Sequence, residues 1–295
     1  MANLRDVRLR MRAIKQTLQV TKAMNLISTS KLRRVRRILV DTITFFTRIQ
    51  KSMFDIISCV ESVDSDYFRK PQRGKTEKSR AAVIVITSDK GLAGGYNANV
   101  IKTAKELCKN LNNPMLILIG RIGSRFFYNS PYPVIENFSF NSNLPTVENA
   151  LGVADYLISQ FLWGMLDEIY IVYTHMYSAI KLKPTVRQIL PLSADKIQEG
   201  LTNMGNEERV ELKFEYLPDE KSVFDALVPM YIKGIIYGSL MESYASEQSA
   251  RMTAMDEATK NAQEMLNDLK IKYNRARQAG ISNEIIEIVS GSAAV

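Results

Sequence analysis

Apolar side chains recur every three or four residues along the first sixty residues of the chain. Stepping from Leu4 alternately by three and four residues reaches eighteen positions up to Val63, and fourteen of them are apolar. This spacing of 3.5 residues predicts a helix that packs along a partner helix with a left-handed supercoil. Residues 1–70 contain no proline and no glycine, so we predict one uninterrupted helix for this segment.

Polar residues interrupt this apolar seam at neighbouring positions, Thr21, Asn25 and Ser28. A buried asparagine in such a seam fixes the register of the two helices at some cost in stability. Alternatively, the seam loosens here because a third body packs nearby. The sequence leaves both interpretations open.

A second helical pattern runs from Val223 to about Val289, with Pro218 and Pro229 at or near its start. Small and flexible side chains dominate its seam, which contrasts with the bulky seam of the first helix. The seam positions are Leu227, Tyr231, Gly234, Gly238, Met241, Ala245, Gln248, Met252, Met255, Thr259, Ala262, Leu266, Leu269, Tyr273, Ala276 and Gly280. We therefore expect the first and last helices to pair antiparallel. The alternative is that each helix packs separately on a central domain.

Between the two helices, β-branched apolar runs alternate with helical stretches. We expect strands at 81–87, 115–120, 168–175 and 186–192. Between the strands we expect three helices: one that ends at about residue 112, one near 121–129 and one near 146–163. This alternation predicts an α/β fold with a mainly parallel sheet. The chain then divides into an N-terminal coiled-coil helix (1–70), a central Rossmann-like α/β domain (71–215) and a C-terminal coiled-coil helix (216–295).

Positive charge is concentrated at the N-terminus. The chain carries a net charge of +8 and has a pI near 9.3. Residues 1–40 hold eleven lysines and arginines against one acid, Asp6, which gives this segment a net charge of +10. The densest cluster is Lys31, Arg33, Arg34, Arg36 and Arg37. So one-sided a charge favours an acidic protein surface as partner, with nucleic acid as the alternative.

Candidate catalytic chemistry is sparse. The loop at 88–97, SDKGLAGGYN, follows a predicted strand but matches neither GxGxxG nor GxxxxGK[ST], so we interpret it as a structural turn rather than a nucleotide site. His175 has no evident nucleophile or carboxylate partner, and Cys59 and Cys108 match no metal spacing and are expected to be reduced thiols. We expect no catalytic, metal or cofactor site. Nor does any stretch approach the ~18 uncharged apolar residues of a membrane span.

Three blocks of sequence resemble the gamma subunit of F-type ATP synthases. They are residues 19–24 with 30–33 (QVTKAM and SKLR), residues 88–97, and residues 246–255 with 273–279, followed by Glu284 and Glu287. Departures from the family pattern include Ala93 for a usual cysteine, Gln248 for a usual histidine and Gly280 for a usual alanine.

The resemblance implies a non-catalytic rotor shaft, present in one copy per complex. Its partners would be the alpha and beta subunits of the catalytic hexamer, the epsilon subunit and the membrane c ring. Lys22 and Met24, with Lys31 and Arg33 of the basic arm, would face the acidic lever region of beta. Arg277 and Gln278 would engage the beta catch loop. Ile285 and Ile286 would enter the hydrophobic bearing. The implied location is peripheral, on the cytoplasmic face of a bacterial cell membrane. The alternatives from other classes are a basic coiled-coil protein that binds nucleic acid and a nucleotide-binding enzyme that uses the 88–97 loop.

Overall fold

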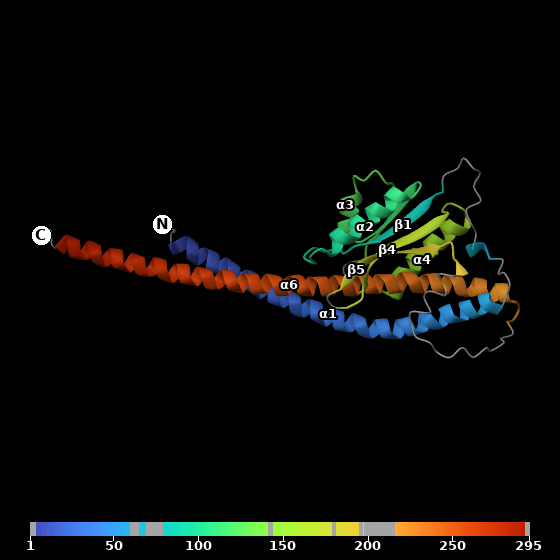
Figure 1. The fold of residues 1–295 in the computed structure, drawn as a ribbon, viewed down its shortest axis with the longest axis horizontal. Helices are drawn as coiled ribbons and strands as arrows, with labels where there is room; N and C mark the ends of the chain where they lie inside the picture. The colour runs from blue at the N-terminus through green and yellow to red at the C-terminus, as the bar shows by residue number, and fades with distance from the viewer. Residues whose placement is uncertain are drawn as a thin grey trace. The chain divides into compact units, whose positions relative to one another are not determined.

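The computed structural model describes residues 4–59, 65–68, 79–140, 144–178, 181–194, 197 and 216–292 (Figure 1). The chain separates into two compact units. The helical unit contains residues 1–30 and 251–295, and the sheet unit contains residues 31–250. Two long helices, α1 (Leu4–Cys59) and α6 (Glu220–Ser292), contribute residues to both units.

The prediction of one uninterrupted helix over residues 1–70 was wrong at its far end. The described part of α1 reaches Cys59, and Asp66–Phe68 form a short 3-10 helix, η1. Residues 60–64 and 69–70, which include the predicted seam positions Val60 and Val63, lie outside the described residues. At η1 the Ser65 hydroxyl oxygen accepts a hydrogen bond from the Tyr67 N–H at 3.4 Å. Serine side chains that bond to nearby backbone groups compete with the α-helical hydrogen-bond pattern, which accounts for a break that proline and glycine do not mark.

The predicted seam of α1 is confirmed. Every described seam position from Leu4 to Ile56 is buried or half-buried, whereas almost all other side chains up to Val40 are exposed. In the helical unit, α6 lies antiparallel to α1. Arg8 Nη2 donates to Tyr273 Oη, and Thr259 Oγ1 donates to Thr21 Oγ1, so the residue number rises along one helix as it falls along the other.

The sheet unit contains a five-stranded sheet. Its strands are β1 (Ala81–Ile86), β2 (Pro114–Ile119), β3 (Val134–Phe138), β4 (Glu168–Met176) and β5 (Leu182–Leu190). Their order is β3-β2-β1-β4-β5. The first four strands are parallel and β5 is antiparallel to β4, which confirms the predicted mainly parallel α/β fold.

Two details of the strand prediction were wrong. Strand β3 was missed because its five residues, VIENF, carry a polar pair in the middle and lie at an edge of the sheet. Strand β5 begins at Leu182 and ends before Pro191, whereas the apolar run suggested 186–192. Edge strands carry weak apolar patterns because fewer of their side chains are buried, so the sequence signal at both edges is weak.

Each face of the sheet is covered by helices. On one face, Val83 and Val85 of β1 pack with α2 (Tyr96–Asn110) and α3 (Arg121–Phe127). On the other, Ala82, Ile84 and Ile86 belong to a core shared with α4 (Val147–Leu162) and with the α1 and α6 segments of the sheet unit. Alternation of side chains along a strand explains how consecutive residues of β1 serve two separate cores.

Within the sheet unit, α6 is enclosed. It begins after Asp219, whose carboxylate accepts hydrogen bonds from the Ser222 backbone N–H (2.8 Å) and hydroxyl (2.7 Å). From Tyr231 to Ala250 no residue is exposed. An 18-residue window of α6 has a mean hydropathy of 1.3, which is apolar enough for a membrane span, but 56% of it is buried inside the protein. Its apolar side chains therefore serve the core of the sheet unit.

Candidate partner-binding surfaces

The polar interruption of the seam is a specific contact between the two helices of the helical unit. Asn25 Nδ2 donates to the main-chain carbonyl oxygen of Met252 at 3.1 Å. One turn away, the hydroxyls of Thr21 and Thr259 lie 2.8 Å apart, and Thr259 also bonds to the carbonyl of Met255. Thr21 and Ser28 are buried. These bonds favour the interpretation that the polar positions fix helix register.

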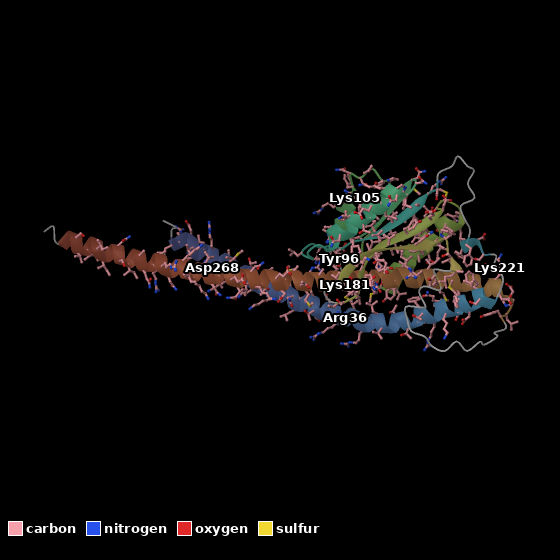
Figure 2. The ribbon with its side chains drawn as sticks, in the orientation of Figure 1. Arg36, Tyr96, Lys105, Lys181, Lys221 and Asp268 are labelled. Carbon is pink, nitrogen blue, oxygen red and sulfur yellow. The ribbon has the colours of Figure 1, made fainter. Side chains whose placement is uncertain are left out.

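The basic residues of α1 all face solvent. Each of the eleven lysines and arginines from Arg5 to Arg37 is exposed, whereas the seam residues between them are buried or half-buried. Figure 2 labels Arg36 on α1 within the densest cluster. Lys31 and Arg33 belong to this cluster, on the part of α1 that lies in the sheet unit. One face of α1, the heptad seam, is therefore buried, and the positive charges lie on the solvent-exposed faces.

Exposed apolar side chains lie beside the predicted contact residues Lys22 and Met24. Lys22 is exposed and Met24 half-buried, and the nearby Leu26 and Ile27 are 71% and 56% exposed. Lys22 and Leu26 are four residues apart, so they share one helix face. Sequence reasoning missed Leu26 and Ile27 because they fall outside the heptad seam. Large side chains left outside the core next to a cation indicate a mixed basic and apolar contact surface.

The C-terminal end of α6 extends past the described start of α1. A β-carbon at Gly280 would lie 4.0 Å from Leu4 Cδ1, so the residues after Gly280 lie beyond Leu4. Five apolar side chains in this end are exposed. They are Ile281, Ile285, Ile286, Ile288 and Val289, which we call the apolar tip. Ile285 and Ile286 are 55% and 60% exposed, and the predicted contacts Arg277 and Gln278, just before the tip, are exposed as well.

The six predicted contact residues in the helical unit do not form one site. In the helical unit, Arg8 pairs with Tyr273 and Asn25 with Met252. Arg277 and Gln278 therefore lie near the start of α1, and Lys22 and Met24 lie level with a part of α6 about 30 Å away along the axis, at 1.5 Å per residue. Lys22 and Met24 lie at one level of the helical unit, and Arg277 and Gln278 lie about two turns before Ile285 and Ile286 at another. Such separate levels suit contacts with several partner segments.

The loop at 88–97 is closed by its own side chains. Ser88 N–H donates to Asn97 Oδ1 (2.9 Å), Asn97 Nδ2 donates to Ser88 Oγ (2.8 Å), and Ser88 Oγ donates to the Lys90 carbonyl (2.7 Å). Asp89 accepts from the Arg121 N–H at 3.0 Å, which connects the loop to α3. Leu92 and Gly94 adopt positive φ angles of 64° and 52°. The polar groups of the loop bond to one another, which favours a structural turn over a phosphate cradle.

His175 has a carboxylate partner, contrary to the expectation from the sequence. Its Nδ1 lies 2.7 Å from Glu242 Oε2 on α6, within the sheet unit. The hydrogen bond to Glu242 is the main cause that raises the pKa of His175, and partial burial opposes it. The two residues are 67 positions apart, which is why no local pattern predicts the pair. Among the described residues, no group of His, Cys, Asp and Glu is arranged to hold a metal ion.

Comparisons with known proteins match the whole chain. The family model described as ATP synthase matches residues 3–295. The ATP synthase gamma chain of Acetivibrio thermocellus is 40% identical over 296 residues, covering all of both chains. A central stalk and c-ring structure of the Tetrahymena thermophila mitochondrial ATP synthase aligns at 25% identity with a TM-score of 0.57, over 81% of this chain and 99% of that one. A Euglena gracilis mitochondrial ATP synthase structure, at 17% identity, shares the fold with a TM-score of 0.64 over 99% and 94% of the two chains.

Proposed function

The chain belongs to the ATP synthase gamma-chain family, and on this premise we propose that its two paired helices carry rotation from the membrane sector to the catalytic sites of the complex. It is the central rotor shaft, a non-catalytic subunit that couples ion flow to ATP synthesis or hydrolysis, and the catalytic sites lie in the beta subunits. The observation that carries this function is the antiparallel pairing of α1 and α6, with register fixed by Asn25 and an exposed apolar tip beyond it.

The exposed surfaces support specific partners. The cationic side chains of α1 complement an acidic surface, and we assign Lys22, Met24, Lys31 and Arg33 to contact with the beta subunits of an alpha–beta hexamer. Leu26 and Ile27 add apolar area at the same level as Lys22. A rotating shaft meets each beta subunit in turn. It can favour one conformation of a beta subunit only if it binds that conformation more tightly than the others, because equal binding to all conformations leaves their populations unchanged.

The apolar tip supports a second contact. Its isoleucine side chains are 49–71% exposed, so an apolar sleeve in the hexamer would remove them from water. At about 25 cal/mol per Å² of apolar surface, such burial stabilises the seated tip by several kcal/mol. Arg277 and Gln278, just before the tip, are assigned to a polar loop of beta at the mouth of that sleeve.

The sheet unit is assigned to contact with the c ring and the epsilon subunit, at the cytoplasmic face of a bacterial membrane. One solved structure that aligns with this chain is a central stalk with its c ring. The α6 segment through this unit is enclosed by sheet and helix, so the chain associates with the membrane through partners.

The comparisons support the rotor function and give no support to the nucleic-acid alternative. The basic face of α1 is accounted for by an acidic protein surface. A salt-dependent gel shift with duplex DNA, run beside binding to the alpha–beta hexamer, separates the two. We expect hexamer binding at salt concentrations that abolish retention on DNA, because counterion release makes non-specific DNA binding steeply salt-dependent.

The direct test is reconstitution. The chain is co-expressed with alpha and beta subunits, and the purified complex is assayed for ATP hydrolysis with and without this chain. We expect one copy to co-purify with the hexamer and to change its rate of hydrolysis. Failure to co-purify, with the chain itself folded, would overturn the proposal.

A further inference from the structure

Strand β4 continues beyond its parallel neighbour. Pairing between β1 and β4 ends at Val85 and Val172, whereas β4 runs on to Met176. On its other side β4 pairs with β5 as far as Met176, so the main-chain groups without a strand partner are those that face the β1 side. The last residues of β4 therefore need hydrogen-bond partners from elsewhere, because buried main-chain groups are rarely left unpaired.

Helix α6 supplies those partners. Thr174 N–H donates to Ser243 Oγ at 3.3 Å, and Ser246 Oγ donates to the Thr174 carbonyl oxygen at 3.0 Å. Ser243 and Ser246 are three residues apart, so their hydroxyls lie on one face of the helix. The two hydroxyls take the place that an extension of β1 would occupy. Thr174, Ser243 and Ser246 are only 2%, 1% and 0% exposed, so water does not replace these bonds.

An ion pair extends the same contact. His175 follows Thr174, and its imidazole bonds to Glu242, the residue before Ser243. Two consecutive residues of β4 are thus bonded to three residues of α6. We call these five residues, Thr174, His175, Glu242, Ser243 and Ser246, the β4–α6 joint.

The joint differs in kind from the packing around it. Elsewhere along the enclosed part of α6 most contacts are apolar, and apolar attraction is non-directional, so it tolerates a helix that turns about its axis or slides. Hydrogen bonds weaken steeply when their angle or distance changes. A set of directional bonds to main-chain atoms therefore resists rotation of α6 against the sheet. Its α6 residues also lie within about three turns of Arg251, the first α6 residue of the helical unit.

We propose that the β4–α6 joint transmits torque, by holding α6 in a fixed rotational position against the sheet while the rotor turns under load. This inference rests on the proposed rotor function and adds the residues through which the sheet unit drives the helix. The five are positioning residues, because they touch no nucleotide and act only through the orientation of α6.

The test uses the complete complex in vesicles, with the double variant Ser243→Ala/Ser246→Ala. A voltage-sensitive dye measures the membrane potential built during ATP hydrolysis, which reports whichever ion is pumped. The coupling ratio is the initial rate of potential build-up divided by the rate of ATP hydrolysis. Ser239→Ala is the matched control, because Ser239 is a buried serine on the same helix with no hydrogen bond to β4 among the described residues.

We expect the double variant to hydrolyse ATP but to lose coupling, with the ratio falling at least about twofold, since two buried bonds that hold the helix are gone. A merely structural role would lower assembly or thermal stability and leave this ratio unchanged in the complexes that form. A ratio equal to that of the unaltered chain, or an equal fall in Ser239→Ala, would overturn the joint.

If the double variant fails to assemble, substitutions in the half-buried pair of His175 and Glu242 test the joint instead. Glu242→Gln and His175→Gln alter side chains with 23% and 34% exposure, which the fold tolerates better. A lowered ratio in both supports the joint, and an unaltered ratio in both overturns it. A complex of the unaltered chain that hydrolyses ATP without building any potential would instead overturn the rotor function itself, and the joint with it.

Discussion

The side-chain amide of Asn25 donates a hydrogen bond of 3.1 Å to the main-chain carbonyl oxygen of Met252 on the opposing helix. The asparagine also accepts from Thr29 at 3.4 Å, and its neighbour in the seam, Thr21, bonds to Thr259. A displacement of one helix by a single turn would break the Asn25–Met252 and Thr21–Thr259 bonds and bury polar groups against apolar side chains. The polar part of the seam therefore selects one register over the others that a heptad repeat allows.

Replacing Asn25 with leucine should relax this selection. We expect the thermal midpoint of the Asn25→Leu chain to stay the same or rise, because an apolar seam residue buries more surface. A second population should appear, displaced by one heptad, about 10 Å along the axis. Electron-spin distance measurement between labels at the exposed positions Gln19 and Glu264 reports the register. Asn261→Leu, an exposed asparagine on α6, is the control, and a single unshifted distance in Asn25→Leu would contradict the role of Asn25.

Two glycines of α6 should respond oppositely to alanine. A β-carbon at Gly234 would overlap the ring of Phe46, which packs directly on this glycine in the sheet unit. We expect Gly234→Ala to destabilise the chain by about 1–3 kcal/mol, because the ring cannot retreat without disturbing the core. At Gly280 the same atom would make ordinary contact with Leu4, 4.0 Å away. Gly280→Ala should stabilise by up to about 1 kcal/mol through higher helix propensity.

Urea unfolding of the purified chain measures both glycine variants. Adding Phe46→Leu to Gly234→Ala should recover part of the loss, since a smaller side chain leaves room for the methyl group. Equal effects of the two alanines, of either sign, would show that helix propensity alone decides and that the Phe46 contact is unimportant.

The apolar tip should matter to the complex and not to the isolated chain. The double variant Ile285→Asp/Ile286→Asp changes side chains that are more than half exposed. Its free energy of unfolding should therefore stay within about 0.5 kcal/mol of the unaltered value. Charges on a tip that enters an apolar sleeve cost desolvation energy, so ATP synthesis in reconstituted vesicles should fall. Ser282→Asp, an exposed position just before the isoleucine pair, serves as control, and unchanged synthesis in the double variant would argue against a seated tip.

The parts of the structure that local sequence could predict are those with a repeating pattern. The seam from Leu4 to Ile56 follows from spacing alone, and strands such as Ala81–Ile86 follow from continuous apolar β-branched runs. What the sequence missed depends on contacts between distant residues. Strand β3 is held by pairing to β2 rather than by its own apolar pattern, and the partner of His175 lies 67 residues away. The exposed residues Leu26 and Ile27 were not predicted as contact residues, because the heptad pattern identifies only the residues that pack against α6.

Stability should depend on pH through His175. Its pKa is raised above the ordinary histidine value of 6.5, chiefly by the hydrogen bond to Glu242. A histidine whose pKa is raised on folding contributes stability fully below its unfolded pKa, near 6.5, and loses that contribution as the pH rises through the folded pKa. Unfolding of the unaltered chain should therefore become easier as the pH rises from below 6.5 through the raised pKa of His175, where the imidazole loses its charge.

Several groups lie around this imidazole besides Glu242 of α6. The Tyr177 ring meets it edge to face at 4.5 Å, and Lys181 lies over Tyr177. Tyr173, whose pKa is raised to about 12 by burial, interacts with Glu242, Arg187 and Tyr177. Glu242→Gln removes the carboxylate that raises the pKa of His175, so it should remove most of the pH dependence without reversing it. Thermal midpoints of the unaltered chain, His175→Gln and Glu242→Gln are compared across that range. Parallel midpoint curves for all three would show that the pair contributes nothing, whereas convergence of the unaltered curve on the variants at high pH would establish the charged pair as a bond between β4 and α6.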